Sequence, residues 1–485
     1  MKNRSLVSQF FSAQTLCGVI IALVTLGLAS CGQRYYKFPA YTYANRPIPP
    51  SKIDSRVLVG VTTNGSSGTL EILDGKRDIR SSIFNANSTF FISGFSSGFP
   101  STIINFPEQV RGYVYSDSDG SISNVNYSTE ASAPVSGGFA PNKSSSLAIP
   151  ISFNHIYSAM EANGQLGIID NTSGKAYALN LPNVFKVFVN QGDTVVLAMV
   201  RNSNTLYRIL KLNANQAAPA GAVDCQPYNL PVYCGVPVAD STTKPSFDRP
   251  INAYFSLDGS SVYVLNCGPE CGGNTSGVTV LQQGALTVDL NTAPYPAAVT
   301  SSVAIPGGAT AVVSDGTTLY LSGQQLQPDG LWGGELTLLN LSTMVPGAPI
   351  SISDGNHTKM LFADDNTLWI GSQSCATGER QAHGQNYNCL TRFDLGAGTA
   401  QIFPNVVPNG PTTVPYPNAN QNPYYYGDLT GICWIQDQHK VYTAYGGQIH
   451  AFNTADGSEI NNSAITVQGT ALDVAYMDAL TNAAN

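Results

Sequence analysis

Apolar and polar residues alternate with a period of two along most of the chain, in short runs separated by polar turns. This period is typical of half-buried β-strands. One unit recurs: an apolar strand, a polar turn often containing Asp-Gly, a strand with Tyr or Trp between aliphatic residues, a loop, and a third apolar strand ending in Asp or Asn. The clearest copies cover residues 253–290, 309–340 and 359–394, and in the first copy we assign the third strand to 284–290. The pattern predicts an all-β fold.

Weaker copies extend the unit over most of the chain. The copy at the N-terminus lacks a first strand, and Ala471–Tyr476 supplies one at the C-terminus. Eight units predict an eight-bladed β-propeller whose N- and C-terminal strands share one blade. Seven blades is the alternative, if the copy at 103–125 is an insertion. The middle strands are expected to begin near residues 57, 112, 156, 195, 262, 319, 368 and 441.

Two local motifs resemble those of known propellers. Residues 258–264 (DGSSVYV) resemble YVTN and WD40-like repeats, and residues 169–175 and 452–458 resemble the D-x-x-T-G-K turn of quinoprotein-like propellers. The resemblance implies a propeller without implying a function, because propellers host many activities. The regular Trp of quinoprotein families is missing, since the chain has three Trp. We therefore expect no quinone and predict no cofactor.

The N-terminus has the features of an export signal. Lys2 and Arg4 precede an apolar run of 13 residues, Leu16–Leu28, shorter than the ~20 needed to span a membrane. Residues 28–31 (LASC) resemble the lipobox of bacterial lipoproteins. That resemblance implies cleavage before Cys31 and acylation of Cys31, palmitate included. The alternative is an ordinary signal peptide cut near residue 30. Because Gly32 is not Asp, we expect an outer membrane location, facing either the periplasm or the surface.

These boundaries give a predicted domain organisation. We expect a signal peptide at 1–30, a lipidated tether rich in Pro and Tyr at 31–55, the propeller at 56–478 and a tail at 479–485. Without Lys2 and Arg4 the chain has 21 basic and 31 acidic residues, a net charge of −10. An acidic chain without a basic stripe is not expected to bind nucleic acid. The membrane is an expected partner, through the acyl chains.

Cysteine spacing predicts three disulfides in an oxidising compartment. A zinc site is the alternative for the central pair, but it would need two more ligands. Cys433 lies in an apolar run and is expected to be a buried free thiol; the alternative is that it pairs with one of the other cysteines. The predicted pairs are Cys225 with Cys234, Cys267 with Cys271, and Cys375 with Cys389.

Candidate chemistry outside the cysteines is sparse. Asp117 and Asp119 are a weak calcium candidate, because a calcium loop needs further ligands that are missing here. An Asp-Gly hairpin turn explains these residues better, so we predict no metal site. His383 lies in the loop between Cys375 and Cys389. The Pro- and Tyr-rich loop 404–427 is either a recognition surface or a strap over the propeller. Its candidate binding residues are Tyr416, Tyr424, Tyr425 and Tyr426.

No catalytic set emerges from the sequence, which favours a non-enzymatic role. We expect a lipid-anchored propeller that acts as a binding scaffold at the cell envelope, with a protein, peptide or glycan partner. A lactonase-like propeller hydrolase is one alternative, and its His, Glu and Arg cannot be mapped onto this chain. The other alternative is an outer membrane protein assembly factor. The chain resembles the known eight-bladed assembly lipoprotein only in its anchor and its number of blades.

Overall fold

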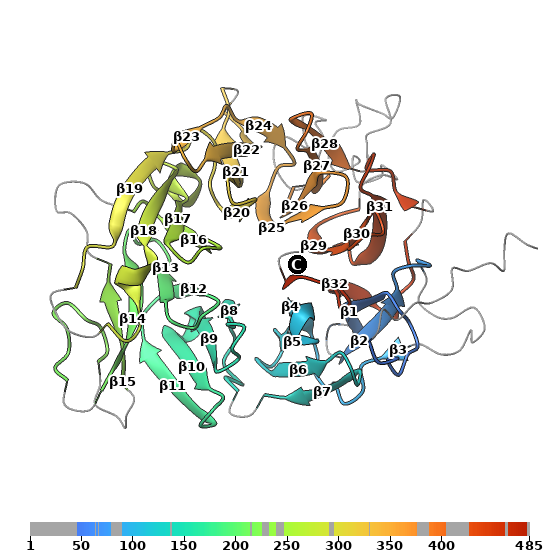
Figure 1. Cartoon of the computed structure of the whole chain (residues 1–485), viewed down its shortest axis with the longest axis horizontal. Coiled ribbons are helices and arrows are strands. Elements are labelled where there is room, and N and C mark those ends of the chain that lie inside the picture. The colour runs from blue at the N-terminus through green and yellow to red at the C-terminus, as the bar shows by residue number, and fades with distance from the viewer. Residues whose placement is uncertain are drawn as a thin grey trace, which may run out of the picture. The chain divides into compact units, whose positions relative to one another are not determined.

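The computed structural model describes residues 46–78 except 64 and 66, and then 90–135, 138–213, 216–225, 232–238, 247–290, 295–328, 330–375, 388–403, 426–460 and 464–482. Residues Pro49–Asn485 form one compact unit, separate from Met1–Ile48. The unit is a β-propeller of eight antiparallel sheets arranged in a ring, as Figure 1 shows, and we call the centre of this ring the channel. Within the described part, no helix is long and apolar enough to cross a membrane.

The first four blades follow one another along the chain, and each has four strands ordered from the channel outward. Blade 1 contains β4 (Pro100–Phe106), β5 (Arg111–Ser116), β6 (Ile122–Asn126) and β7 (Ala131–Pro134), with the 3-10 helix η1 (Pro107–Gln109). Blade 2 contains β8 (Ser146–Ala148), β9 (His155–Met160), β10 (Gln165–Asp170) and β11 (Lys175–Asn180), with η2 (Glu161–Asn163). Blade 3 contains β12 (Val184–Val189), β13 (Val196–Val200), β14 (Leu206–Leu212) and β15 (Val232–Pro237). Blade 4 contains β16 (Pro250–Phe255), β17 (Ser261–Asn266), β18 (Gly277–Gln282) and β19 (Val299–Ala304), with η3 (Gly268–Cys271) and η4 (Gln283–Leu286).

The remaining blades vary in strand number. Blade 5 contains β20 (Ala311–Ser314), β21 (Thr318–Leu326), β22 (Trp332–Asn340), β23 (Val345–Pro346) and β24 (Ile350–Ile352). Blade 6 contains β25 (Asn356–Ala363), β26 (Thr367–Gln373), β27 (Leu390–Asp394) and β28 (Thr399–Phe403). Blade 7 contains β29 (Leu429–Ile435), β30 (Lys440–Tyr445) and β31 (Gln448–Asn453). The closing blade contains β32 (Thr470–Tyr476), β1 (Arg56–Thr63), β2 (Ser67–Asp74) and β3 (Phe90–Phe91).

The predicted architecture is confirmed. The closing blade joins β32 from the C-terminus to β1 from the N-terminus, and residues 100–134 form a blade of their own, which excludes seven blades. One strand assignment was wrong: the third strand of blade 4 is Gly277–Gln282, whereas 283–286 form η4. Residues 277–282 (GVTVLQ) pair with β17 along their whole length, so they satisfy the ladder before 284–290 is reached.

Asp or Asn at the end of the third strand has a clear local cause. Its side-chain oxygen accepts the backbone N–H groups two and three residues later and so closes the turn into the fourth strand. Asp170 accepts from Thr172 and Ser173 in this way, and Asp394 accepts from Gly396 and Ala397. The same turn closes the hairpins after Asn126 and Asn340. The repeat therefore encodes its own hairpins.

The core lies between neighbouring blades. In blade 6 the aromatic residue of the second strand lies at the centre of this core: Trp369 is fully buried and packs against Phe403 of the same blade and Phe452 of blade 7. Because each blade buries its faces against two neighbours, the ring depends on its closure.

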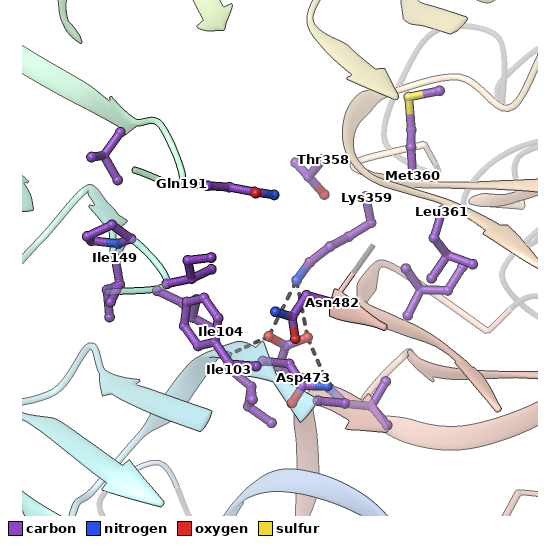
Figure 2. Close-up of a pocket in the computed structure, with 18 residues that line it drawn as sticks. Ile103, Ile104, Ile149, Gln191, Thr358, Lys359, Met360, Leu361, Asp473 and Asn482 are labelled. Atoms are coloured by element: carbon purple, nitrogen blue, oxygen red, sulfur yellow. Dashed lines mark hydrogen bonds and ion pairs between the residues drawn. The ribbon is translucent and has the colours of Figure 1, made fainter. Parts of the chain in front are cut away.

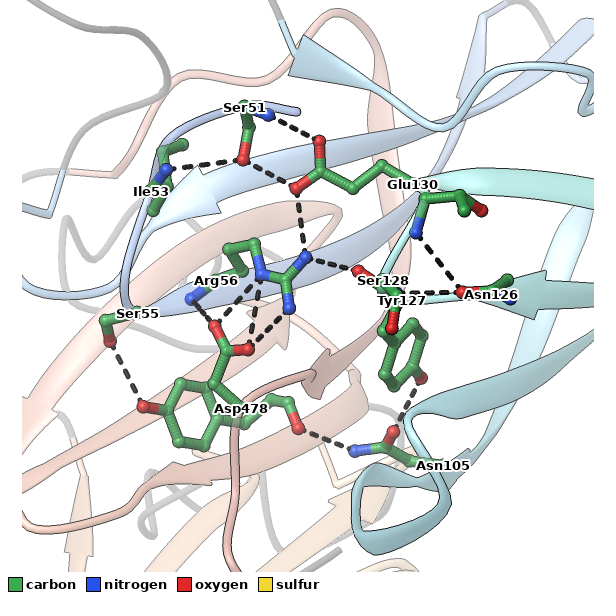
Figure 3. Close-up of polar contacts among 12 residues, drawn as sticks. Ser51, Ile53, Ser55, Arg56, Asn105, Asn126, Tyr127, Ser128, Glu130 and Asp478 are labelled. Carbon is green, nitrogen blue, oxygen red and sulfur yellow. Dashed lines mark hydrogen bonds and ion pairs between the residues drawn. The ribbon is translucent and has the colours of Figure 1, made fainter. Parts of the chain in front are cut away.

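A buried polar network holds that closure, as Figure 3 shows. The Arg56 guanidinium lies 2.6 Å from Asp478 Oδ1 and 3.0 Å from Glu130 Oε1, and all three side chains are at most 5% exposed. Arg56 Nη1 also donates to the Tyr127 carbonyl. Glu130 in turn accepts the backbone N–H of Ser51 at 2.7 Å. The network joins the segment before β1, the end of β32 and blade 1.

Candidate functional site

The innermost strands of six blades carry a β-bulge, which re-aims the residues beside it. In blade 6, Thr358 has no cross-strand partner, and the register resumes at Lys359. In the closing blade the register resumes at Asp473. We call the residues that follow these bulges the inner ring: Thr102, Lys186, Asn252, Lys359, Gly431 and Asp473.

Inner-ring side chains join neighbouring blades. Asn252 Nδ2 of blade 4 donates to the Thr310 carbonyl next to blade 5 at 3.0 Å. Asp473 Oδ2 accepts the backbone N–H of Ile103 in blade 1 at 2.8 Å, while Oδ1 accepts the N–H of Val474 at 3.0 Å. The Asp473 side chain is 2% exposed. Two backbone N–H groups thus compensate for the burial of this carboxylate.

Lys359 reaches past one blade to form an ion pair. Its Nζ lies 3.2 Å from Asp473 Oδ1 and 3.4 Å from Oδ2, and its side chain is 30% exposed. Between them, blade 7 presents Gly431 at the same ring position. A Cβ on Gly431 would lie 2.4 Å from Asp473 Oδ1. Because Gly431 has no side chain, the Asp473 carboxylate has the space in which it pairs with Lys359.

The ion pair faces a cavity of about 480 Å³ in the channel. Six blades contribute to its lining, through the strands β4, β12, β25, β29 and β32 and the turn after β8. Figure 2 shows Lys359 extending toward Asp473 and Gln191 extending toward Thr358 from the opposite side. Apolar walls come from Ile103, Ile104, Ile149, Ile151 and Val189. The volume falls within the range of small-molecule sites.

The C-terminal segment completes the lining. Asn482 lines the cavity, its Nδ2 donates to Gln109 Oε1, and its backbone N–H donates to Glu108 Oε1 at 2.9 Å. Leu480 N–H donates to Gln436 of blade 7. The segment is thus fixed to blades 1 and 7.

Two titratable side chains lie close behind the cavity wall. Burial lowers the pKa of His357 to about 4, and this imidazole therefore stays neutral while its Nε2–H donates to the Ser353 carbonyl. Burial, followed by the charge of Asp473, raises the pKa of the Cys433 thiol. Cys433 is free and fully buried. Neither group is available as a nucleophile or acid at neutral pH.

The two faces of the propeller differ. The innermost strands run in the same direction, so they begin at one face, which we call the start face, and finish at the other, which we call the end face. The segment Pro49–Ser55 enters β1 at the end face, because β1 runs antiparallel to β32. Loops between second and third strands lie on the start face, and these include the disulfide-closed loops Cys267–Cys271 and Cys375–Cys389.

The longest described hairpin, β21–β22, lies beside the first of these loops. Glu270 accepts the Gln324 N–H at 2.8 Å and so ties the disulfide-closed loop to the hairpin. Leu326 and Trp332 face each other near its tip and are 54% and 37% exposed. The start face therefore displays an apolar pair on a braced hairpin.

The predicted disulfides are present in the structure. The third pair, Cys225–Cys234, lies in blade 3 toward the end face. Of the four tyrosines in loop 404–427 that were predicted to bind a partner, Tyr426 lies within the described residues. Its ring stacks on His450 with 4.1 Å between the ring centroids, and its hydroxyl donates to Glu459 Oε2 at 2.6 Å. Cys31, His383, Tyr416, Tyr424 and Tyr425 lie outside the described residues, but Phe403 and Leu429 place both ends of the loop on the start face.

Asp117 and Asp119 lie in the β5–β6 turn. Asp119 Oδ1 accepts the Ser121 N–H at 3.0 Å, and Gly120 has the positive φ of a tight turn. Burial raises the pKa of Asp119, but hydrogen bonds from Ser121 and Ser116 together outweigh it, so that the pKa is lowered. Within the described residues, no group of three or more His, Cys, Asp or Glu could hold a metal ion.

Comparison with known proteins supports the fold. No family model and no curated protein matches the chain. The solved structure of dihydro-heme d1 dehydrogenase NirN in complex with DHE is similar, with 13% identity and a TM-score of 0.52 over 91% of this chain and 83% of that chain. AztD from Citrobacter koseri has 10% identity and a TM-score of 0.47 over 87% and 97%. A putative 6-phosphogluconolactonase from Bacteroides uniformis has 11% identity and a TM-score of 0.41 over 87% and 99%. The chain has a β-propeller fold. At these identities the similarity extends to the fold alone.

Proposed function

We propose that the chain is a lipid-anchored propeller of the cell envelope that presents its start face to a protein partner. The observation that carries the proposal is the separation of the two faces. The polypeptide from Cys31 joins the ring at the end face, where Ser51 and Arg56 are held by Glu130. The disulfide-closed loops, the β21–β22 hairpin and both ends of loop 404–427 belong to the opposite face.

The chemistry of the start face favours a protein partner over a glycan. Trp is enriched among the few residues that contribute most of the binding energy at protein interfaces. Trp332 and Leu326 form such a pair, and the Glu270–Gln324 contact limits its movement. A braced loop loses less entropy on binding than a free one.

Affinity purification of the acylated protein from detergent-solubilised envelopes tests the proposal. We expect a partner to co-purify with the wild type and to be lost from Leu326→Ser/Trp332→Ser and from a chain in which residues 404–425 are replaced by a Gly-Ser linker of the same length. The matched control is Leu480→Ser, since Leu480 is 77% exposed on the end face. Loss of the partner in Leu480→Ser but not in the start-face variants would contradict the proposal. Co-purification of peptidoglycan instead of a protein would also contradict it. Turnover of lactones by the purified chain would favour the hydrolase alternative.

A further inference from the structure

The polar groups of the central cavity divide into those already bonded and those still available. Asn105 donates to the Tyr476 carbonyl and accepts the Tyr127 hydroxyl, and Asn482 bonds to Glu108 and Gln109. Gln191 and Thr358 also line the cavity, and neither side chain makes a hydrogen bond within the described part of the chain.

The charge that the cavity exposes is positive. Both oxygens of Asp473 are occupied, by backbone N–H groups and by Lys359, and the side chain is almost inaccessible. An ammonium has three donors, and the Lys359 side chain is 30% exposed in the cavity.

Contacts between adjacent blades do not explain the position of the Lys359 side chain. The inner-ring Asn252 and Asp473 bond directly to the backbone of the adjacent blade. Lys359 instead crosses the gap left by Gly431, and part of its side chain stays open to the cavity. A charged donor beside two uncommitted polar side chains is the arrangement that fixes one polar end of a ligand.

We propose that the central cavity binds a small organic carboxylate, with its carboxylate at Lys359 and its hydrocarbon body against the isoleucine wall. Charge-assisted hydrogen bonds from Lys359, Thr358 and Gln191 would hold the anion. Ile103, Ile104, Ile149 and Ile151 favour an apolar body, which inorganic anions lack. This site is independent of the start-face partner.

Isothermal titration with octanoate tests the proposal on the mature chain carrying Cys31→Ser, so that no acyl chain competes for the cavity. Octanamide is the uncharged probe of the same length. We expect octanoate to bind the wild type more tightly than octanamide does, and Lys359→Gln to weaken octanoate roughly ten- to hundredfold. Lys175→Gln is the matched control, because Lys175 is exposed on the outermost strand of blade 2.

Lys359→Gln leaves the buried Asp473 carboxylate without its cation, and this variant could fail to fold for that reason. Two further variants test the proposal in that case. Lys359→Arg retains the charge and is expected to retain octanoate binding. Lys359→Gln/Asp473→Asn removes both charges and is expected to fold and to bind octanoate no better than octanamide. Absence of octanoate binding to the folded wild type at millimolar concentration would overturn the proposal. Equal affinities for octanoate and octanamide, or unchanged binding in the folded double variant, would also overturn it.

Discussion

Lys359 in blade 6 and Asp473 in the closing blade form an ion pair across blade 7, with Nζ 3.2 Å from Oδ1 and Gly431 between them. Together with the hydrogen bond from Ile103 N–H to Asp473, the pair connects blade 6, the closing blade and blade 1 at the place where the chain closes on itself. Since Asp473 is buried and Lys359 is partly open, the same contact stabilises the ring and presents a cation to the channel.

The space left by Gly431 predicts the effect of filling it. In Gly431→Ala a Cβ would lie 2.4 Å from Asp473 Oδ1 and 2.7 Å from Val474 N. We expect a loss of about 1–3 kcal/mol in the free energy of unfolding, as for other overpacked sites, measured by urea denaturation. Gly284→Ala is the control, because nothing lies within 4 Å of its added Cβ. Equal stabilities of the two variants would contradict the assigned role.

The closure network predicts a strong dependence on Arg56. Arg56→Met would leave Asp478 and Glu130 buried without their cation, and breaking such a pair costs about 3–5 kcal/mol. Arg201→Met removes an Arg–Glu pair in which Arg201 is 52% exposed, and we expect a cost of at most about 1 kcal/mol. Denaturant midpoints of the two variants measure the difference. A small effect at Arg56 would show that the network does not hold the ring.

Buried His357 predicts a loss of stability in acid. Its pKa is lowered to about 4 by burial, whereas an unfolded His titrates near ~6.5. Between these values the unfolded chain binds more protons, so stability from this group is complete above the unfolded pKa and falls as the pH drops toward 4. The loss approaches ~3 kcal/mol. We expect His357→Gln to flatten the dependence between pH 7.5 and 4.5, and an unchanged slope would contradict this.

Thiol labelling tests the cysteine assignments. In the mature acylated chain, we expect no reaction of the folded protein with a maleimide, because Cys433 is buried and its thiol pKa is raised. One thiol per chain should react after unfolding without reductant, and peptide mapping should place it at Cys433. Labelling at any of the six paired cysteines would contradict the disulfides of the structure.

Acylation at Cys31 is tested by metabolic labelling with palmitate. We expect the wild type to incorporate label and to lose residues 1–30, and Cys31→Ser to do neither. Processing of Cys31→Ser at the same position would instead indicate an ordinary signal peptide. Mass spectrometry of the N-terminal peptide distinguishes the two outcomes.

The repeat could be predicted from the sequence because the residues of each blade specify its own strands and turns. The middle strands were expected near 57, 319 and 368, and they begin at Arg56, Thr318 and Thr367. The exception was blade 4, where 277–282 and 284–290 are both apolar and the pairing with β17 decides between them.

The cavity could not be predicted in the same way. Lys359 and Asp473 are 114 residues apart, and the ring that joins them has no local signature beyond a polar residue in an apolar innermost strand. That signal is present at Asp473 and Lys186, where a charge interrupts an apolar run, and at Lys359, where a charge precedes one. The register of the bulges brings these positions to one level of the channel.

Site-specific photo-crosslinking in intact cells tests the central claim most directly, with the crosslinking residue at position 332 on the start face or at position 480 on the end face of the acylated protein. The account predicts a discrete protein adduct from position 332 that disappears with Leu326→Ser, and no such adduct from position 480. The same adduct from position 480, or none from either position in folded and acylated protein, would contradict recognition through the start face.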